Sequence, residues 1–400
     1  MKVVQINATC GIGSTGKICY GISRVMTAEN IENYILCSRS NGYPLGIACS
    51  DSRYIRFQAL RAKILGNYGF NSKGATCKMI AELENIQPDL VHLHNIHGHD
   101  CDLKMLFSWF RRNHVRLLWT FHDCWTFTGY CTYFDMVRCE KWKHMCFNCP
   151  QRKASSWFFD RSRQLFQAKK KLLEDLDLTI ITPSRWLADM VGMSFLKVYP
   201  VQVIYNGIDL NVFRPRRGDF RKKYSLENKK VVLGVAFGWG ARKGLDVFVA
   251  LAERLPEDYK IVLIGTDAET NKLLPDNILS IQRTQNQQEL AEIYTAADVL
   301  ANPTREEVLG LVNIEALACG TPGVTFESGG SPECYDASCG AVVPCDDVDA
   351  MEREILRICT ERPYSEAACI RRAREFDQDK RFKEYVELYE RVNPSGNERN

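Results

Sequence analysis

The segment that decides the fold covers residues 307–315 and reads Glu307-Val-Leu-Gly310-Leu-Val-Asn-Ile-Glu315. Two carboxylates are separated by seven residues, Gly310 lies between them, and a helix-forming run begins near Val312. This order predicts a loop that turns into a helix beneath an anionic ligand, because the first N–H groups of a helix are unpaired and its dipole is positive there. Glu307 is then expected in the loop and Glu315 in the first helical turn. The alternative is that both acids simply favour the helix dipole.

Short apolar segments alternate with amphipathic helical patterns along the rest of the chain. Expected strands cover residues 3–6, 35–37, 90–94, 116–120, 178–182, 231–236, 260–264, 279–282, 299–301 and 323–326. Expected helices include residues 17–28, 103–113, 245–254, 287–296 and 312–318. Strand and helix in alternation predict parallel sheets with right-handed crossovers, and the pattern occurs twice. The predicted fold class is therefore α/β, with two doubly wound, Rossmann-like domains.

The break between these domains is expected near residues 205–230, where the chain becomes polar and strongly basic. We assign residues 1–205 to an N-terminal domain and residues 206–375 to a C-terminal domain. The tail from residue 376 to 392 carries apolar side chains near helical spacing, which predicts a terminal helix.

Composition bounds the class of protein. The chain has 400 residues, 45% of them hydrophobic and 25% charged, as is typical of a globular protein of two or three domains. A formal charge of +3 does not demand a polyanionic partner, and we expect no nucleic acid. Residues 1–7 read as a short strand and no apolar run could span a bilayer, so we expect a cytoplasmic protein. Seventeen cysteines in a long chain without an export signal predict mostly reduced thiols.

Residues 307–315 resemble the E-x7-E motif of retaining glycosyltransferases of the GT-B fold, family 4. Other segments resemble further motifs of this family in the expected order: 88–94 (Pro-Asp-Leu-Val-His-Leu-His), 121–123 (Phe-His-Asp), 182–186 (Thr-Pro-Ser-Arg-Trp), 203–209 (Val-Ile-Tyr-Asn-Gly-Ile-Asp), 242–244 (Arg-Lys-Gly) and 329–333 (Gly-Gly-Ser-Pro-Glu). Within the family the chain is most similar to enzymes that build capsular, exopolysaccharide or colanic-acid-type glycans. The resemblance implies domains that face each other across a cleft, with residues 376–400 crossing back to the first domain.

The resemblance also implies a nucleotide-sugar, linked to UDP or GDP, bound by the second domain. Lys243 and Arg242 would neutralise the departing phosphate, Glu307 would face the sugar, and Glu315 would accept hydrogen bonds from the ribose diol. The chain departs from the family at Phe237, where an Arg is usual. The alternative for Arg242 and Lys243 is that they are ordinary loop charges. Further contacts with the nucleotide-sugar are expected from Gly13, Arg283, Gly310, Leu311 and Val312.

The first domain is expected to supply His122, which by resemblance would bond to the transferred sugar or its developing charge. His94 and Asp123 are assigned to the acceptor side. A purely structural role is the alternative for each His, and the dense group at residues 92, 94, 97 and 99 also raises a metal site. In this family the leaving phosphate is taken as the base, so Glu307 is a positioning group and catalysis requires no cofactor.

Residues 11–17, Gly-Ile-Gly-Ser-Thr-Gly-Lys, match the G-x-x-x-x-G-K spacing of a nucleotide-binding P-loop. Ile18 stands where such a loop needs a Ser or Thr for magnesium. We interpret the segment as the Gly-rich first loop of GT-B enzymes, whose backbone can approach both substrates. An NTPase is the alternative.

An insert at residues 124–150 is rich in cysteine and aromatic residues. Its C-x-x-C pair, Cys146 and Cys149, has the spacing of a zinc knuckle, and Cys131 and Cys139 could complete four thiolates. A structural zinc would hold this loop in shape beside the binding site. The alternative is a set of buried, reduced thiols.

Residues 52–81 contain no acidic side chain, while Arg and Lys alternate with large apolar residues. A basic amphipathic element of this kind suits peripheral contact with anionic lipid at the cytoplasmic face of the inner membrane. A solvated helix face is the alternative.

These observations predict a retaining glycosyltransferase that moves a hexose-type sugar from UDP- or GDP-sugar to a glycan acceptor, linked to polyprenyl diphosphate, in cell-surface polysaccharide biosynthesis. A GT-B-type nucleotide-sugar epimerase would share the architecture but need no acceptor. A non-catalytic scaffold of a glycan assembly is the third hypothesis, and Phe237 favours it slightly.

Overall fold

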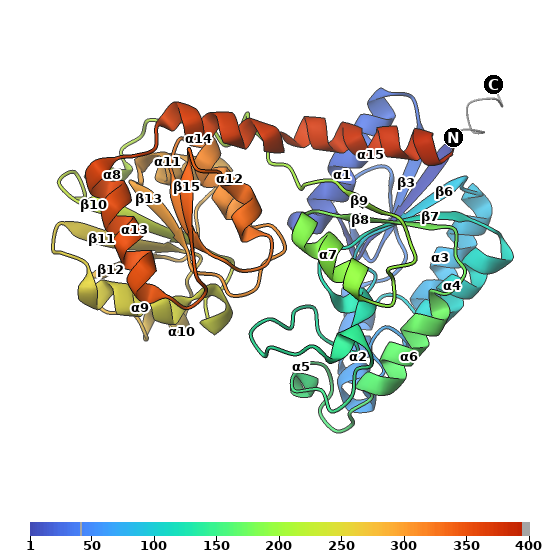
Figure 1. The fold of residues 1–400 in the computed structure, drawn as a ribbon. Coiled ribbons are helices and arrows are strands. Elements are labelled where there is room, and N and C mark those ends of the chain that lie inside the picture. The colour runs from blue at the N-terminus through green and yellow to red at the C-terminus, as the bar shows by residue number, and fades with distance from the viewer. Residues whose placement is uncertain (41, 394–400) are drawn as a thin grey trace. The chain divides into compact units, whose positions relative to one another are not determined.

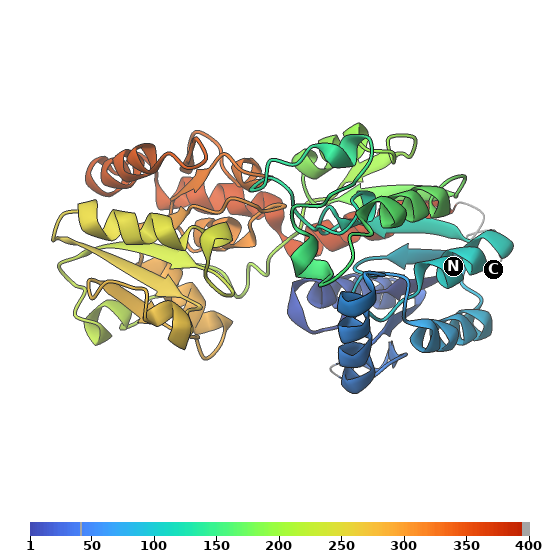
Figure 2. The same cartoon turned by 90° about the horizontal axis from the view of Figure 1, so that it is seen from below.

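The computed structural model describes residues 1–40 and 42–393. The chain divides into two compact units, one comprising Met1–Tyr205 with Asp379–Asn400 and the other Asn206–Gln378. Each unit is a parallel β-sheet with helices on both faces (Figures 1 and 2). The predicted fold class, two doubly wound α/β domains, is therefore confirmed.

The first unit contains a seven-stranded sheet in the order β5-β3-β1-β6-β7-β8-β9. In chain order its strands are β1 (Lys2–Ile6), β3 (Glu32–Cys37), β5 (Gly46–Ala48), β6 (Leu90–Leu93), β7 (Arg116–Thr120), β8 (Leu178–Thr182) and β9 (Val201–Val203), and a small pair is formed by β2 (Thr9–Cys10) and β4 (Arg39–Ser40). All pairs are parallel, with Val4 opposite Tyr34 on one side and Val91 on the other. The central strands are almost wholly buried and apolar because helices cover both faces.

The helices of the first unit lie between these strands in sequence. They are α1 (Gly13–Ala28), α2 (Ser52–Leu65), α3 (Lys73–Ile86), α4 (Leu103–Arg112), α5 (Arg152–Ser155), α6 (Ser162–Leu172) and α7 (Arg185–Met193). Helix α4 shows why they form: Asp102 caps its start by accepting from the Met105 N–H, and Leu106, Phe107 and Phe110 lie on its buried face. Residues 124–150 contain only two short 3-10 turns, Trp125–Phe127 and Lys141–Lys143.

The second unit contains a six-stranded sheet in the order β12-β11-β10-β13-β14-β15. Its strands are β10 (Lys230–Val235), β11 (Tyr259–Ile264), β12 (Ile278–Ile281), β13 (Val299–Asn302), β14 (Gly323–Phe326) and β15 (Gly340–Val343). Its helices are α8 (Phe220–Lys223), α9 (Leu245–Arg254), α10 (Ala268–Asn271), α11 (Gln287–Ala296), α12 (Leu311–Ala318), α13 (Val348–Glu361) and α14 (Glu366–Ala373). One core cluster joins α9 and α13 to β10, β11 and β13.

The terminal helix α15 (Gln378–Val392) returns to the first unit (Figure 1). Phe382, Tyr385 and Tyr389 are buried in the same core cluster as Val3 of β1 and Leu90 of β6. The prediction that the C-terminal segment packs on the first domain is confirmed up to residue 393, and residues 394–400 lie outside the described part of the chain.

All ten expected strands are present, but the prediction omitted the two-residue strands β2 and β4 and, in the two large sheets, β5, β9 and β15. The three strands omitted from the large sheets each lie at a sheet edge, have three or four residues and are partly exposed, so their sequences lack the buried apolar run that marks an interior strand. Helix α1 begins at Gly13, four residues before the predicted start.

Both sheets reverse their strand order next to the first strand of the unit. In the first unit the reversal lies between β1 and β6, and in the second between β10 and β13. Ligands of doubly wound sheets bind beyond the carboxyl ends of the strands at such switch points. The loops that follow these four strands are therefore the places to look for chemistry.

Candidate functional site

The loops after β10, β13 and β14 assemble one polar cluster in the second unit. These three strands are neighbours in the sheet, so their carboxyl ends share one edge. The loop after β10 carries Arg242 and Lys243, the loop after β13 carries Glu307, and the loop after β14 carries Gly329 and Gly330.

Lys243 and Glu307 form the centre of this cluster. The Lys243 Nζ lies 2.5 Å from the Glu307 Oε2, and the two side chains retain 19% and 21% of their exposure. The other carboxylate oxygen, Oε1, accepts from the Val308 N–H at 3.1 Å. A preformed, partly desolvated pair of this kind holds a cation at a fixed place where a solvent-exposed Lys would be mobile.

Glycines allow this packing. Gly329 has φ +55°, and a Cβ there would lie 1.8 Å from the Glu307 carbonyl oxygen. The same oxygen accepts from the Gly330 N–H at 3.1 Å, so the two loops are in direct contact. Gly310 has φ +86° and stands immediately before α12. Side chains at these positions would force the Glu307 loop away from its neighbour.

Helix α12 begins at Leu311, one residue before the predicted start, so Leu311 and Val312 supply its first backbone N–H groups. Asn313 is buried and donates nothing from its Nδ2, although its Oδ1 accepts from Asn302 at 2.9 Å. The hydroxyl of Ser331 is also buried without a hydrogen-bond partner. The Asn313 Nδ2 and the Ser331 hydroxyl both lie within 3.3 Å of the position that a Cβ of Gly310 would take. Two side-chain groups able to form further hydrogen bonds therefore lie at this helix start.

Glu315 does not lie in the first helical turn. It is the fifth residue of α12, because the helix begins at Leu311, and its Oε2 accepts from the Tyr294 hydroxyl at 2.9 Å. Burial and the neighbouring carboxylate raise the pKa of Tyr294 well above its usual range. Glu315 is therefore oriented by a phenol on α11, a contact between helices that motif spacing does not reveal.

The remaining predicted residues of the second unit surround this cluster. The carbonyl of Arg242 accepts from the Arg305 N–H at 2.9 Å, which ties the two loops together. Arg305 in turn pairs with Asp246 and Asp346 at 2.7 and 2.6 Å. Arg283 is exposed in the loop after β12. Phe237 is fully exposed at the end of β10, so it fills no core position.

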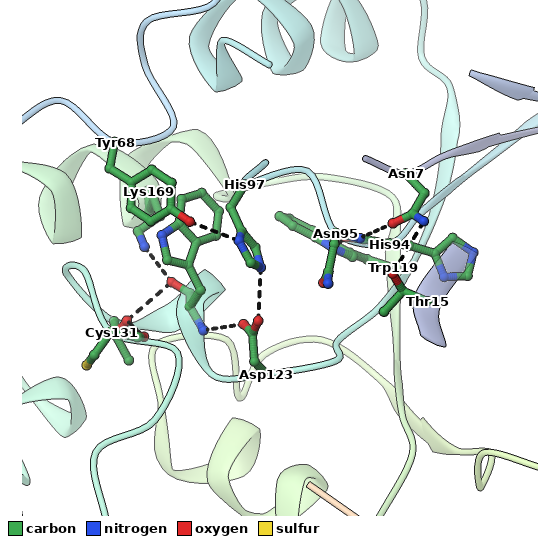
Figure 3. Close-up of polar contacts among 12 residues, drawn as sticks. Asn7, Thr15, Tyr68, His94, Asn95, His97, Trp119, Asp123, Cys131 and Lys169 are labelled. Atoms are coloured by element: carbon green, nitrogen blue, oxygen red, sulfur yellow. Dashed lines mark hydrogen bonds and ion pairs between the residues drawn. The ribbon is translucent and has the colours of Figure 1, made fainter. Parts of the chain in front are cut away.

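The first unit brings together a second group of polar residues at the ends of β1, β6 and β7 (Figure 3). His94 follows β6, and His122 and Asp123 follow β7. His94 shares a hydrogen bond of 3.1 Å with His122 and another of 3.1 Å with the Gln5 Oε1. Burial lowers the pKa of His122 to about 4 and that of His94 well below its usual range. Both imidazoles are therefore neutral at pH 7.

His97 also belongs to this group, although the sequence pattern indicated it only within the alternative of a metal site. Its Nε2 lies 2.9 Å from the Asp123 Oδ2, and its Nδ1 shares a hydrogen bond of 3.1 Å with the Tyr68 hydroxyl (Figure 3). Burial opposes a charged imidazole, but the Asp123 carboxylate outweighs it and raises the pKa of His97. Burial likewise works against an ionised Asp123, yet the pair with His97 and the Trp125 N–H lower its pKa. The spacing of His97 three residues after His94 was the available signal.

The Gly-rich loop lies at the end of β1, next to this group. The Gly11 N–H donates to the Gly16 carbonyl at 2.9 Å, and Asn7 holds the loop through the Thr9 carbonyl at 2.7 Å. Gly13 has φ +69° and nothing within 4 Å of its Cβ position. Open space above a glycine backbone permits close approach by a ligand.

The expected metal site in the insert is not formed. Across residues 1–40 and 42–393, no group of three or more His, Cys, Asp or Glu side chains is arranged to hold a metal ion. Cys131, Cys139, Cys146 and Cys149 line one small cavity as free thiols. Burial raises the pKa of Cys131 to about 12 and that of Cys146 to about 11, so both remain protonated and neutral.

A buried lysine stabilises the same insert. The Lys169 Nζ donates to the Trp125 carbonyl and lies 4.0 Å from the centre of the Trp125 ring. Burial lowers the pKa of Lys169 to about 7.

The group of histidines at residues 92, 94, 97 and 99 likewise holds no metal site, because His92 is engaged by Tyr389 at 2.6 Å and Thr120 at 2.8 Å.

No helix in the described part of the chain is long and apolar enough to cross a membrane.

Two family models match successive parts of the chain. The model for "Glycosyltransferase Family 4" matches residues 16–212, and the model for "Glycosyl transferases group 1" matches residues 229–361. The chain is 27% identical over 194 residues to D-inositol 3-phosphate glycosyltransferase of Mycobacterium sp. (strain KMS), a match that spans 45% of this chain and 44% of that relative. It is 25% identical over 278 residues to a protein of Escherichia coli (strain K12) named as a colanic acid biosynthesis glycosyl transferase, spanning 65% of each.

Solved structures extend the likeness of fold to nearly the whole chain. Anabaena HepE in complex with UDP and glucose superposes with a TM-score of 0.67 at 13% identity, covering 97% of this chain and 99% of that one. The chain thus has the GT-B fold of the group 1 and family 4 glycosyltransferases.

Proposed function

We propose that this protein is a retaining glycosyltransferase that moves a sugar from UDP- or GDP-sugar to a glycan acceptor. The observation that carries the proposal is the Lys243–Glu307 pair beside the start of α12. At one switch point, a cation and a helix start suit the negatively charged diphosphate of a nucleotide-sugar, and a carboxylate suits the hydroxyls of its sugar.

Each residue of the second unit then has a role. The backbone N–H groups of Leu311 and Val312 receive the diphosphate, while Lys243 and Arg242 neutralise the charge that develops as it leaves. Glu307 holds Lys243 in place and accepts hydrogen bonds from the sugar. Glu315, oriented by Tyr294, accepts from the ribose diol. Arg283 and the surrounding loop border the base.

The proposed reaction conserves the configuration of the sugar. The acceptor oxygen forms a bond to the anomeric carbon on the face from which the phosphate oxygen departs, and the acceptor proton passes to that phosphate oxygen. No side chain attacks the sugar. Lys243, Arg242 and the helix start lower the barrier because they are already oriented toward the developing charge.

The first unit is proposed to serve the acceptor. Neutral His122 donates its single N–H to the His94 Nδ1, because the Gln5 Oε1 is an acceptor and places the His94 proton on Nε2. The remaining ring nitrogen of His122 can accept a hydrogen bond from a sugar hydroxyl without placing a positive charge beside an oxocarbenium-like centre. Asp123, held ionised by His97, would orient the acceptor hydroxyl. His94, with its ring nitrogens engaged by His122 and Gln5, would serve the acceptor side by positioning His122. The open backbone at Gly13 leaves room for either substrate.

The acceptor is proposed to be a glycan linked to polyprenyl diphosphate, in the biosynthesis of a capsule, exopolysaccharide or related cell-surface glycan. The relative named for colanic acid biosynthesis supports this choice. A lipid-linked acceptor implies a cytoplasmic protein in peripheral contact with an anionic membrane. UDP is favoured as the nucleotide because Anabaena HepE, similar in fold, was solved with UDP and glucose.

One experiment separates this proposal from its two alternatives. Thermal shift with a panel of UDP- and GDP-sugars identifies the nucleotide-sugar, since a ligand at a hundred times its Kd stabilises by about 2.7 kcal/mol. Nucleotide release is then measured with and without a polyprenyl-diphosphate-linked glycan. We expect release to depend on the glycan. Release or epimerisation without it would indicate an epimerase, and binding without turnover under every condition would indicate a scaffold.

A further inference from the structure

Three consecutive aromatic side chains are exposed on the first unit. Trp157, Phe158 and Phe159 retain 47%, 63% and 50% of their exposure, although Ser156 before them is buried. A single exposed aromatic residue is ordinary in a globular protein, but a contiguous group marks a surface that meets another apolar phase.

The backbone of this segment is held firmly, so the aromatic exposure is not that of a loose loop. The Trp157 N–H donates to the Lys63 carbonyl at 2.8 Å, and the Phe158 carbonyl accepts from Arg152 at 3.0 Å. The Tyr130 hydroxyl lies 3.4 Å from the Phe159 carbonyl. These bonds present the rings outward in a fixed arrangement and reduce the entropy lost when they are covered.

Helix α2 continues the same surface. Phe57, Leu60 and Ile64 are 61%, 47% and 38% exposed, and their spacing of three and four residues places them on one face of the helix. The opposite face buries Gln58 and Ala62. Because Lys63 near the end of α2 accepts from Trp157, the helix and the aromatic segment are adjacent; Figure 1 shows α2 beside α5, which immediately precedes that segment.

Cations border these apolar side chains. Arg53, Arg56 and Arg61 are exposed on α2, at helical spacing from the apolar stripe. The nearby acids are engaged in local structure: Asp51 caps α2 through the Arg53 N–H at 2.8 Å, and Asp160 accepts from the Cys149 N–H at 2.7 Å. Both carboxylates keep their negative charge, but the three exposed arginines of α2 outnumber them, so the outward face is apolar with a positive balance of charge.

We propose that the aromatic-basic surface, formed by the exposed side chains of α2 and residues 157–159, binds an anionic lipid bilayer directly. The rings of Trp157, Phe158 and Phe159 enter the boundary between headgroups and acyl chains, and the arginines of α2 contact anionic headgroups. This surface would make the peripheral membrane contact that accompanies the proposed function, on which the inference rests.

A bilayer is the occupant favoured by the chemistry. Aromatic residues with a fixed backbone and flanking arginines are suited to the interfacial layer, where an apolar boundary lies just below negative charge. Residues 52–81 contain no acid that would repel such a surface. A protein partner or a second copy of this chain would instead be revealed by a change in oligomeric state that requires no lipid.

Vesicle binding of the purified full chain tests this. The probe is liposomes of phosphatidylethanolamine with or without phosphatidylglycerol, without glycan or nucleotide-sugar. Each Arg near an anionic surface contributes about 1 kcal/mol, so the triple change Arg53→Gln, Arg56→Gln, Arg61→Gln is expected to weaken binding to phosphatidylglycerol vesicles about a hundredfold. The triple change Trp157→Ser, Phe158→Ser, Phe159→Ser is expected to weaken binding to at least a comparable extent, on the order of a hundredfold.

Matched controls use exposed residues elsewhere. The set Arg24→Gln, Arg353→Gln, Arg371→Gln removes the same charge, and Val198→Ser with Leu273→Ser removes exposed apolar side chains. Both control sets are expected to bind vesicles like the unmodified chain. Equal binding by the test and control variants overturns the proposal, as does self-association through this surface in the absence of lipid.

A second measurement does not rely on multiple substitutions. Lipids brominated near the headgroup should quench part of the tryptophan fluorescence of the unmodified chain, and Trp157→Phe should abolish that quenching. Quenching unchanged in Trp157→Phe counts against the surface. Because neither assay involves sugar transfer, vesicle binding with no transfer would refute the proposed function and leave this surface intact.

Discussion

Lys243→Ala provides the sharpest test of the proposed site. The substitution removes the cation that lies 2.5 Å from the Glu307 carboxylate, and that carboxylate keeps its hydrogen bond from the Val308 N–H. It therefore changes both folding stability and the charge presented to a leaving phosphate. The two effects can be measured separately.

The expected magnitudes follow from burial. Exposed ion pairs contribute about 0–1 kcal/mol and the loss of one partner of a fully buried pair costs about 3–5 kcal/mol. The Lys243 and Glu307 side chains are 19% and 21% exposed, so we expect a loss of about 1–2 kcal/mol in unfolding free energy. Loss of a preorganised group that stabilises developing charge costs on the order of 3 kcal/mol, which lowers kcat/KM more than about a hundredfold.

Stability is measured by urea unfolding and turnover by nucleotide release. Lys272→Ala is the matched control, because Lys272 also pairs with a Glu in the second unit, at 2.7 Å, but the side chains are 68% and 81% exposed. It should lose less than about 0.5 kcal/mol and keep its turnover. Lys243→Arg keeps the charge and should fall between the control and Lys243→Ala.

One result would refute the reasoning. If Lys243→Ala loses stability as expected but its kcat/KM stays within about threefold of the unmodified chain, the pair only holds the loops together. The phosphate would then have to be neutralised elsewhere.

The other predictions concern the acids, a glycine and a histidine. Glu315→Ala should weaken nucleotide binding, whereas Glu307→Gln should depress kcat more than affinity, and equal losses of affinity with unchanged kcat would reject this division. Tyr294→Phe should weaken nucleotide binding less than Glu315→Ala, because the carboxylate remains; equal effects would mean that Glu315 serves only to satisfy the phenol. Gly329→Ala should lower both stability and turnover, because its Cβ would lie 1.8 Å from the Glu307 carbonyl oxygen, and a fully active variant would contradict the packing of these loops. Burial lowers the pKa of His92 to about 3, so the unfolded chain binds a proton that the folded chain refuses. This residue alone should lower the unfolding free energy by up to ~1.4 kcal/mol per pH unit as pH decreases from about 6.5, in addition to the effects of His94 and His122, and His92→Gln should reduce the measured slope by that amount.

Local patterns were sufficient for the architecture. Alternation of apolar strands and amphipathic helices depends on hydrogen bonds and burial that each segment makes in the same way wherever it lies, so the ten strands, the two sheets and the terminal helix could be predicted. The loop-to-helix turn at Gly310 could be predicted for the same reason, since a positive φ and a helix start are local features. The edge strands β5, β9 and β15 were not predicted, because they are short and partly exposed and their apolar pattern is therefore weak.

Contacts between distant segments were decided only by the tertiary structure. The 2.5 Å approach of Lys243 to Glu307 and the phenol of Tyr294 on Glu315 depend on which strands are neighbours in the sheet. His97 and Asp123 meet because β6 and β7 are adjacent. The four cysteines of the insert show the converse, because zinc-like spacing does not make a site when, in the described part of the chain, the thiols are not arranged around an ion. Spacing along a chain determines local geometry, whereas the positions of charges that are far apart in sequence are set by the packing of the whole sheet.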